Sequence, residues 1–415
     1  MLSALAGMGA AQHLVPLAEA LRARGHRVSV VSAPDALDAF EHLDVELHAV
    51  AEPPMPELLQ TLPPLAQRAR QVFARVQSNV IDPLPAQWEV VRDVIADAAV
   101  DVVVSDALFL GGAMLSVLPR EDRPAVVLVG FFPPWIPDPA VPPYGLGLPP
   151  ADNGMNRVRA AGFELLASRA YARLSRSFNT QVERTFGVPR KGDLRSSPAG
   201  GDAWVQLTVP RFEYPRTALP PNFRFVGPLH PGGPDPVPDW WDPRAEPPVV
   251  VVRVNGESGI DDLVLPSIRA FEDSADTVVV AGVSRAAVAH AFRRPLPATV
   301  HFEDRPPWSR LIPQRSVVIS DGDYLHTQHA LRRGVPLVVA GTLETDVETA
   351  ARVAWTGAGV DLRTRRPEPS AIREAVERIR GDGAYRIAAA KIAAQIASTD
   401  AETELCELVE TLSTR

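Results

Sequence analysis

The sequence predicts an α/β protein made of two doubly wound parallel-sheet domains that face each other across a cleft. Three observations predict it: a length of 415 residues, short apolar runs that alternate with helical patterns, and a proline-rich break between two such series. A chain this long exceeds one ordinary core, so two domains are expected. Continuous apolar runs are typical of parallel strands whose two faces are both covered by helices.

The first series occupies the N-terminal part of the chain. Strands are expected at residues 1–6, 27–32, 100–104 and 125–129, and helices over most of 56–98 and at 162–186. Between the first two strands, Leu14, Leu17, Ala18 and Leu21 recur at helical spacing and Gly25 ends the helix. This strand–helix–strand unit implies a parallel sheet.

The second series begins after a proline-rich stretch. Strands are expected at residues 249–254, 277–280, 316–319 and 336–340, with a helix at 263–271 and two helices between 371 and 412. The predicted boundaries are 1–212 for an N-terminal domain, 213–246 for a linker, 247–395 for a C-terminal domain and 396–415 for a last helix. Two such domains predict a ligand cleft at the carboxyl ends of both sheets.

Composition excludes several classes of protein. The net charge of −8, without a compensating basic run, argues against nucleic acid as a partner. The single cysteine, Cys406, excludes an intramolecular disulfide and fits a reducing compartment. The N-terminal residues resemble neither a signal peptide nor a membrane span, so a cytoplasmic protein without membrane spans is expected.

The most informative stretch is the predicted strand–turn–helix at residues 316–336. A turn of this kind directs backbone N–H groups and the positive end of a helix toward a ligand, most often a phosphate. Here the turn contains two carboxylates, Asp321 and Asp323, where a phosphate would lie. Near the N-terminus, residues 7–12 approach a dinucleotide fingerprint, but Gln12 takes the place of its third glycine, so a nicotinamide cofactor is not expected.

Seven stretches, in order along nearly the whole chain, carry a family resemblance. They are residues 12–17, 21–28, 101–107, 143–150, 219–228, 330–336 and 352–360. Together they resemble the inverting glycosyltransferases of the GT-B fold, in particular those of bacterial antibiotic and other natural-product biosynthesis. The resemblance implies two Rossmann-like domains, a hydrophobic small-molecule substrate, and a last helix (396–415) that crosses back onto the N-terminal domain.

The resemblance assigns two catalytic residues in the N-terminal half. His13 matches the general base that acts on the acceptor hydroxyl, and Asp106 matches the aspartate that orients it. Independently, His13 at a helix N-terminus should stay neutral, and an aspartate at a strand end could fix its tautomer. The alternative is a histidine at a helix start with an unrelated aspartate. An apolar cleft for a bulky substrate is expected to be lined by Phe73, Trp88, Phe131 and Trp135.

The donor motifs of the family are degenerate in this chain. In place of His-Gly-Gly-x-Gly-Thr the chain has residues 321–326, which retain only Gly322 and end with His326; Thr345 and Asp346 replace the Asp-Gln pair that holds sugar hydroxyls. The stretch 253–258 replaces a small Ser/Thr-Gly pattern, and Trp308 stands in the loop that contacts the nucleobase. A carboxylate about 4 Å from a phosphate costs on the order of 4 kcal/mol at an effective dielectric near 20.

Three functional hypotheses follow. The first is an enzyme that uses His13 and Asp106 for proton transfer or cyclisation, with the sugar-nucleotide site lost and no cofactor. The second is a working glycosyltransferase that binds an NDP-sugar in an unusual way, and the third is a non-catalytic partner protein. The degenerate motifs favour the first. A divalent metal that bridges to a diphosphate is an alternative, with candidate ligands Asp321, Asp323, His326, His329, Glu344 and Asp346.

Overall fold

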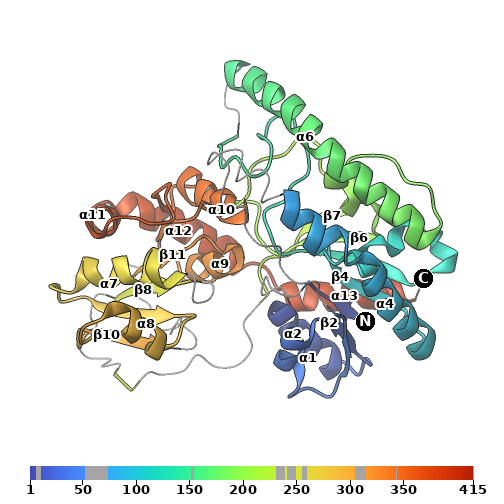
Figure 1. Ribbon diagram of the computed structural model, residues 1–415, viewed down its shortest axis with the longest axis horizontal. Coiled ribbons are helices and arrows are strands. Elements are labelled where there is room, and N and C mark those ends of the chain that lie inside the picture. The colour runs from blue at the N-terminus through green and yellow to red at the C-terminus, as the bar shows by residue number, and fades with distance from the viewer. Residues whose placement is uncertain are drawn as a thin grey trace.

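The computed structural model describes residues 1–5, 11–51, 73–150, 154–229, 239–240, 249–254, 259–303, 315–342 and 344–414. Within these residues the chain forms two parallel sheets, which lie side by side in two halves of the molecule (Figure 1). We call residues 1–229 the N-terminal half and residues 249–396 the C-terminal half. The predicted α/β fold with two doubly wound sheets is confirmed.

In the described part of the N-terminal half the sheet has seven strands, in the order β3-β2-β1-β4-β5-β6-β7, and all neighbours are parallel. The strands are β1 (Leu2–Ser3), β2 (Ser29–Ser32), β3 (Glu46–Ala49), β4 (Val102–Asp106), β5 (Ala125–Gly130), β6 (Ala203–Gln206) and β7 (Phe223–Phe225). Strand β7 lies inside the segment predicted as linker. It pairs with β6, with Phe223 opposite Trp204, so the sheet continues beyond residue 212.

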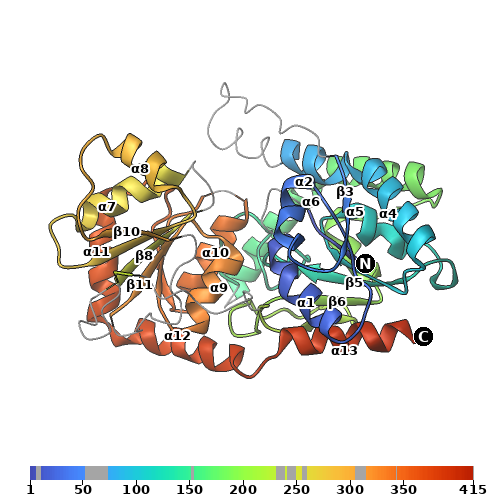
Figure 2. The ribbon, with the colours of Figure 1, turned by 90° about the horizontal axis from the view of Figure 1, so that it is seen from below.

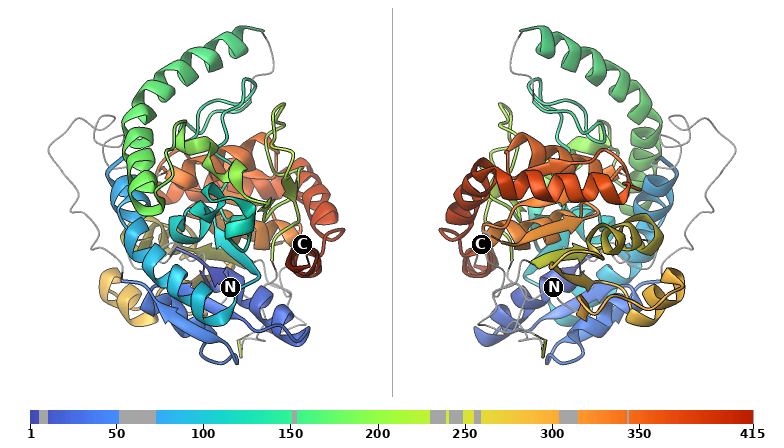
Figure 3. Two further views of the ribbon diagram at one scale, coloured as in Figure 1. Left: turned by 90° about the vertical axis from the view of Figure 1, so that its right-hand side faces the viewer. Right: turned by 90° about the vertical axis from the view of Figure 1, so that its left-hand side faces the viewer.

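Helices cover both faces of this sheet. They are η1 (Ala11–Leu14), α1 (Val15–Ala23), α2 (Pro34–Leu37), η2 (Asp38–Phe40), η3 (Val76–Ile81), α4 (Leu84–Ala98), α5 (Leu110–Ala113), η4 (Met114–Val117), η5 (Arg120–Asp122), α6 (Gly154–Phe186) and η6 (Leu194–Gly200). Helix α6 has 33 residues and extends beyond the rest of its half (Figure 3). Residues 52–72, part of the predicted helical segment 56–98, lie outside the described residues.

The described part of the C-terminal half has six parallel strands in the order β10-β9-β8-β11-β12-β13. The strands are β8 (Val249–Arg253), β9 (Thr277–Ala281), β10 (Val300–Glu303), β11 (Val317–Ser320), β12 (Leu337–Val339) and β13 (Gly359–Asp361). The helices are η7 (Ile260–Val264), α7 (Leu265–Phe271), α8 (Arg285–Phe292), α9 (Tyr324–Arg332), α10 (Glu344–Trp355), α11 (Pro369–Gly381) and α12 (Gly383–Ile396), followed by α13 (Ala401–Ser413).

Residues 371–412, predicted as two helices, belong to three. Two aspartates mark the two breaks between these three helices, because each caps the start of a new helix. Asp382 accepts a hydrogen bond from the N–H of Ala384, and Asp400 accepts one from the N–H of Thr403. Helix α13 then crosses back to the N-terminal half and packs against α1, as Figure 2 shows.

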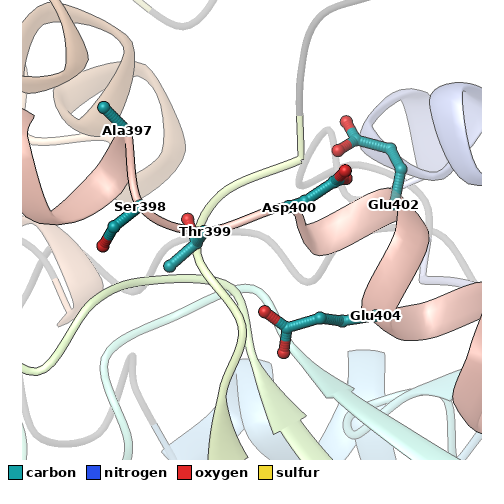
Figure 4. Close-up of a pocket in the computed structure, with 6 residues that line it drawn as sticks. All are labelled: Ala397, Ser398, Thr399, Asp400, Glu402 and Glu404. Atoms are coloured by element: carbon teal, nitrogen blue, oxygen red, sulfur yellow. The ribbon is translucent and has the colours of Figure 1, made fainter.

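The connection between α12 and α13 is an open polar groove. Figure 4 shows its lining, which consists of Ala397, Ser398, Thr399, Asp400, Glu402 and Glu404. Gly227 is needed where this connection passes the N-terminal half, because a Cβ atom there would lie 2.0 Å from Thr399 Oγ1. The crossing is therefore tightly seated on one side and open to solvent on the other.

A buried ion-pair network joins the two halves. Arg352 of α10 donates to Glu213 of the N-terminal half at 2.9 Å and to Glu348 of its own helix at 2.8 Å. The Tyr324 hydroxyl of α9 also donates to Glu213, at 2.6 Å. The N–H groups of Gly145 and Gly147 donate to Glu348. Buried charges are tolerated only when they are paired in this way, so the network fixes α9 and α10 relative to the N-terminal half.

Candidate active site

The order of the strands marks one special point on each sheet. The chain leaves β1 toward β2 on one side and later adds β4 on the other; in the second sheet β8 lies between β9 and β11 in the same manner. In open α/β sheets, ligands bind outside the carboxyl ends of the strands at such switch points. The residues to consider are therefore those that follow β1, β4, β8 and β11.

His13 follows β1 and faces the other half. Its ring centroid lies 5.9 Å from that of His326 and 6.0 Å from that of His329, both on α9. Burial lowers the pKa of His13 to about 4; the nearby His326 and Arg253 act in the same direction, and Asp323 opposes them. His13 is therefore neutral at pH 7 and keeps a lone pair that can accept a proton.

Asp106, at the end of β4, does not contact His13. Its carboxylate accepts hydrogen bonds from the N–H of Leu108 at 2.9 Å and from the N–H of Leu5 at 3.4 Å. Among the described residues, no hydrogen bond joins it to His13, so the predicted dyad is not assembled in this structure. Burial raises the pKa of Asp106 to about 7 against the effect of these two N–H donors. The loop between β1 and His13, residues 6–10, lies outside the described residues.

The turn after β11 and the start of α10 are brought together. Gly322 has φ of +104°, and a Cβ atom there would lie 2.9 Å from the Cα of Asp346. Only glycine fits this position without strain. Next to it, the Thr345 hydroxyl lies 3.4 Å from the carboxylate of Asp346. Gly322, Thr345 and Asp346 therefore form one surface, as the aligned motifs predict, whereas Trp308 lies outside the described residues.

The Asp323 carboxylate is used within the protein. It caps α9 by accepting a hydrogen bond from the N–H of His326 at 2.8 Å, and its Oδ1 lies 3.2 Å from Nδ1 of the same histidine. Burial alone would raise the pKa of Asp323, but the His326 ring and N–H hold it well below its usual range. The predicted repulsion between this carboxylate and a phosphate assumed that the carboxylate has no partner. Its pairing with His326 weakens that repulsion.

Arg253, the last residue of β8, completes this group. Its Nη2 lies 2.9 Å from Nε2 of His326, and its Nη1 donates to the carbonyl of Val254 at 3.0 Å. A guanidinium can only donate, so Nε2 of His326 accepts and its proton lies on Nδ1, toward Asp323. Arg253 belongs to the stretch 253–258, which departs from the family pattern, but no role was assigned to it from the sequence. The arginine in place of a small residue was the signal that could have identified it as a site residue.

Three of the four predicted cleft residues pack against other described residues of the N-terminal half. Phe73 packs edge-on against Tyr171, Trp88 lies 4.7 Å from Phe186, and both partners belong to α6. Phe131 is buried in the core. Large aromatic side chains in a helical segment more often fill the contact between helices, and this explains the difference.

Trp135 differs from the other three, because it borders a small hollow with a volume of about 10 Å³. The hollow is lined by Pro134, Trp135, Ile136, Pro137, Val141, Pro142, Pro143, Tyr144, Glu164, Arg195, Arg216 and Glu348. This volume is enough for about one water molecule and too small for a bulky substrate.

The alternative metal site finds no support in the geometry. In the part of the chain that the structure describes, no three His, Cys, Asp or Glu side chains are placed to hold a metal ion. The side chain of Glu344 is not among those described.

In the described residues, no helix is long and apolar enough to cross a membrane.

Comparisons with known proteins identify a family model and relatives of similar sequence. Residues 273–412 match the family described as "Erythromycin biosynthesis protein CIII-like, C-terminal domain". The chain is 31% identical to 4'-demethylrebeccamycin synthase of Lentzea aerocolonigenes, over 98% of this chain and 97% of that protein. It is also 31% identical to UDP-glycosyltransferase 2 of Phaeomoniella chlamydospora, over 82% of this chain and 78% of that protein.

Solved structures show the same fold. The glycosyltransferase of kitacinnamycin aligns with a TM-score of 0.72 at 20% identity, over 99% of this chain and 98% of that one. The spinosyn rhamnosyltransferase complexed with thymidine diphosphate aligns with a TM-score of 0.70 at 19% identity, over 99% of each chain. Two facing doubly wound sheets with a returning C-terminal helix thus define the GT-B class of fold. The chain belongs to the glycosyltransferases of natural-product biosynthesis.

This result corrects the first functional hypothesis. An enzyme that no longer transfers sugar was favoured because residues 321–326 and 345–346 depart from the family motifs. Relatives named as a UDP-glycosyltransferase and a UDP-glucosyltransferase match over 82% and 94% of this chain, which supports the second hypothesis, and no finding supports a cyclisation or isomerisation. Asp323 was counted as a free carboxylate in the sequence, whereas it lies 3.2 Å from Nδ1 of His326; the second carboxylate of the turn, Asp321, accepts a hydrogen bond from the N–H of Asp323 at 3.3 Å.

Proposed function

We propose that this chain transfers a sugar from a nucleoside diphosphate sugar to a bulky, largely apolar small molecule, with inversion at the anomeric carbon. The observation that carries the proposal is the position of the neutral His13 ring against α9, where the switch points of the two sheets face each other. A relative named as a UDP-glycosyltransferase and a related fold solved with thymidine diphosphate support uridine and thymidine nucleotides as the first donors to test.

In this mechanism His13 takes the proton of the acceptor hydroxyl. The acceptor oxygen then forms a bond to the anomeric carbon, and the bond from that carbon to the donor phosphate breaks, releasing the nucleoside diphosphate. A histidine that is neutral at pH 7 is suited to this role, because its lone pair is available before the acceptor arrives. Asp106 remains a candidate to orient His13, provided that its contacts with Leu5 and Leu108 rearrange.

The acceptor is proposed to reach His13 at the carboxyl edges of the two sheets, where this histidine faces α9. Ligands of open α/β sheets bind at this edge.

The test is an assay for sugar transfer with the full-length chain. UDP- and TDP-sugars are combined with a panel of polycyclic and macrocyclic acceptors, and products are detected by mass spectrometry. Replacing His13 with Ala or Gln should lower kcat by about 10²- to 10⁴-fold. The matched control is His42→Ala, because His42 is an exposed histidine of the same half. Unchanged turnover in both His13 variants would remove the base from the proposal.

A further inference from the structure

We propose that Arg253 binds the diphosphate of the donor, and that His326 and Asp323 hold Arg253 in place. This inference rests on the proposed function and names the residues that take over from the glycine-rich turn of the family. Arg253 would be the binding residue, and the other two would be positioning residues.

Arg253 lies at the carboxyl edge of the C-terminal sheet. It is the last residue of β8, and it lies in register with Ser320 of β11 on one side and Ala281 of β9 on the other. Its side chain therefore starts at the switch point of the C-terminal sheet, directly beside the turn that begins at Asp321. A ligand at this edge meets Arg253 and the start of α9 together.

The molecule makes room for this side chain. A Cβ atom on Gly282, the residue after β9, would lie 1.8 Å from Nη1 of Arg253. The guanidinium thus occupies the space above a residue without a side chain, and it remains partly exposed to solvent. Its place at the carboxyl edge is built into the neighbouring strand.

Arg253 carries a positive charge at this edge. Within the described residues, no carboxylate oxygen lies within 4.0 Å of its guanidinium, and its hydrogen bonds go to Val254 and His326. A guanidinium has five N–H donors, so several remain for a ligand. Its planar fork matches the oxygens of a phosphate. Burial lowers the pKa of Arg253 and the nearby Asp323 and Asp321 act to raise it, but neither carboxylate accepts a hydrogen bond from the guanidinium, so its remaining donors can receive an anion.

The carboxylate of Asp323 in the turn has a role in this arrangement. Asp323 accepts from the N–H of His326 and lies 3.2 Å from its Nδ1, which leaves Nε2 to accept from Arg253. The three side chains form one chain of contacts from the helix cap to the guanidinium. Asp323 therefore does not oppose a diphosphate in this scheme, because it orients the histidine that holds the cation.

The binding test uses titration calorimetry with the full-length chain and two probes, UDP and TDP. Replacing Arg253 with Gln should weaken binding of the better probe on the order of 10- to 100-fold, because a charge-assisted hydrogen bond is lost. Binding of the matching nucleoside, which has no phosphate, should be unchanged. Arg253→Lys should recover part of the affinity. Arg378→Gln is the control, since Arg378 is an exposed arginine on α11 of the same half.

The outcomes separate this inference from the proposed function. If the wild-type chain binds UDP or TDP and Arg253→Gln binds equally well, the inference is wrong and the glycosyltransferase proposal stands. If the wild-type chain binds neither probe, nor any NDP-sugar, both are wrong.

The positioning roles need a different readout, which is the donor KM compared with kcat. His326→Ala should raise the donor KM by about tenfold and change kcat less, because a charge-assisted hydrogen bond that orients Arg253 is lost. His326→Gln should restore most of the affinity, since its amide can also accept from Arg253. Equal KM values in both His326 variants and the wild type would exclude the positioning role.

Discussion

Two of the places where the N- and C-terminal halves meet differ in their chemistry. Around Glu213 and Arg352 the contact is fully buried and is made of charge-assisted hydrogen bonds between 2.6 and 2.9 Å. Around His13 the contact consists of ring faces about 6 Å apart, and no hydrogen bond between described residues joins this histidine to α9. Both places involve the same helix, since Tyr324 and His326 are two residues apart on α9.

The buried contact holds the two halves together, whereas the contact around His13 belongs to the candidate active site. A satisfied network of buried charges resists rearrangement, because any movement exposes an unpaired charge. Among the described residues, no hydrogen bond joins the ring of His13 to the histidine rings of α9, so these rings can separate without losing one. Tyr324 and His326 lie in the same first turn of α9, so one face of this turn holds the halves in register, and the face that carries His326 is left to admit a donor and an acceptor.

The largest effect should follow from breaking the buried contact. Replacing Arg352 with Ala leaves the carboxylates of Glu213 and Glu348 buried without their guanidinium, which should cost about 3–5 kcal/mol of unfolding free energy. The measurement is urea-induced unfolding followed by circular dichroism. Arg378→Ala on the exposed side of α11 is the control and should change stability by less than about 0.5 kcal/mol. Equal stability of the two variants would show that the network does not hold the halves.

A second effect, of intermediate size, concerns pH. The pKa of His13 is about 4 in the folded chain and 6.5 by default, so the unfolded chain takes up this proton first and acidification from pH 6.5 to 4 destabilises the fold. Asp106 has the opposite sign. Its folded pKa is about 7 against a default of 3.8, so the folded chain takes up the proton first and acidification stabilises it.

Unfolding midpoints of two variants at several pH values check this pair of signs. His13→Gln should lose less stability than the wild type on acidification, and Asp106→Asn should lose more, each by on the order of 3 kcal/mol over its whole window. A shift in the same direction for both variants would contradict the burial of one of the two groups.

The smallest effect belongs to the polar contact of the C-terminal helix. Glu410 of α13 pairs with Arg24 at 3.2 Å and lies 3.2 Å from His26, and the three side chains are between 33% and 40% exposed. Exposed pairs of this kind add little, so Glu410→Ala should leave the unfolding temperature unchanged within error. Leu405→Ala, on the buried face of the same helix, should lower it clearly. The reverse order would mean that charge rather than apolar burial holds α13.

Most of the fold could be predicted from the sequence, because buried parallel strands leave continuous apolar runs. The strands at 249–253 and 317–320 are of this kind. Five strands were missed, namely β3, β6, β7, β10 and β13. Strand β7, for example, has three residues at the sheet edge with little burial and follows a proline-rich stretch. The third C-terminal helix was missed because the sequence is helical in pattern on both sides of Asp382 and Asp400. Only the capping contacts of these two aspartates show that a new helix begins after each.

The candidate site could be predicted only in part. The aligned motifs placed Gly322 and Asp346 in one donor site, and the two residues lie together in the structure; the family resemblance selected His13, which lies opposite α9. The contacts of Asp106 with Leu5 and Leu108 could not be predicted, because backbone N–H groups leave no trace in composition. Nor could the pairing of Asp323 with His326, which decides whether its charge repels a phosphate.

The return of α13 to α1 has a consequence for how the protein is made. Leu405 and Cys406 are fully buried and belong to the same apolar cluster as Leu14 and Leu17 near the other end of the chain. A ribosome releases the N-terminal half long before these residues are synthesised, so that half waits with an uncovered apolar surface until α13 has been made. A premature stop codon within α13 would therefore damage the part of the protein that was translated first.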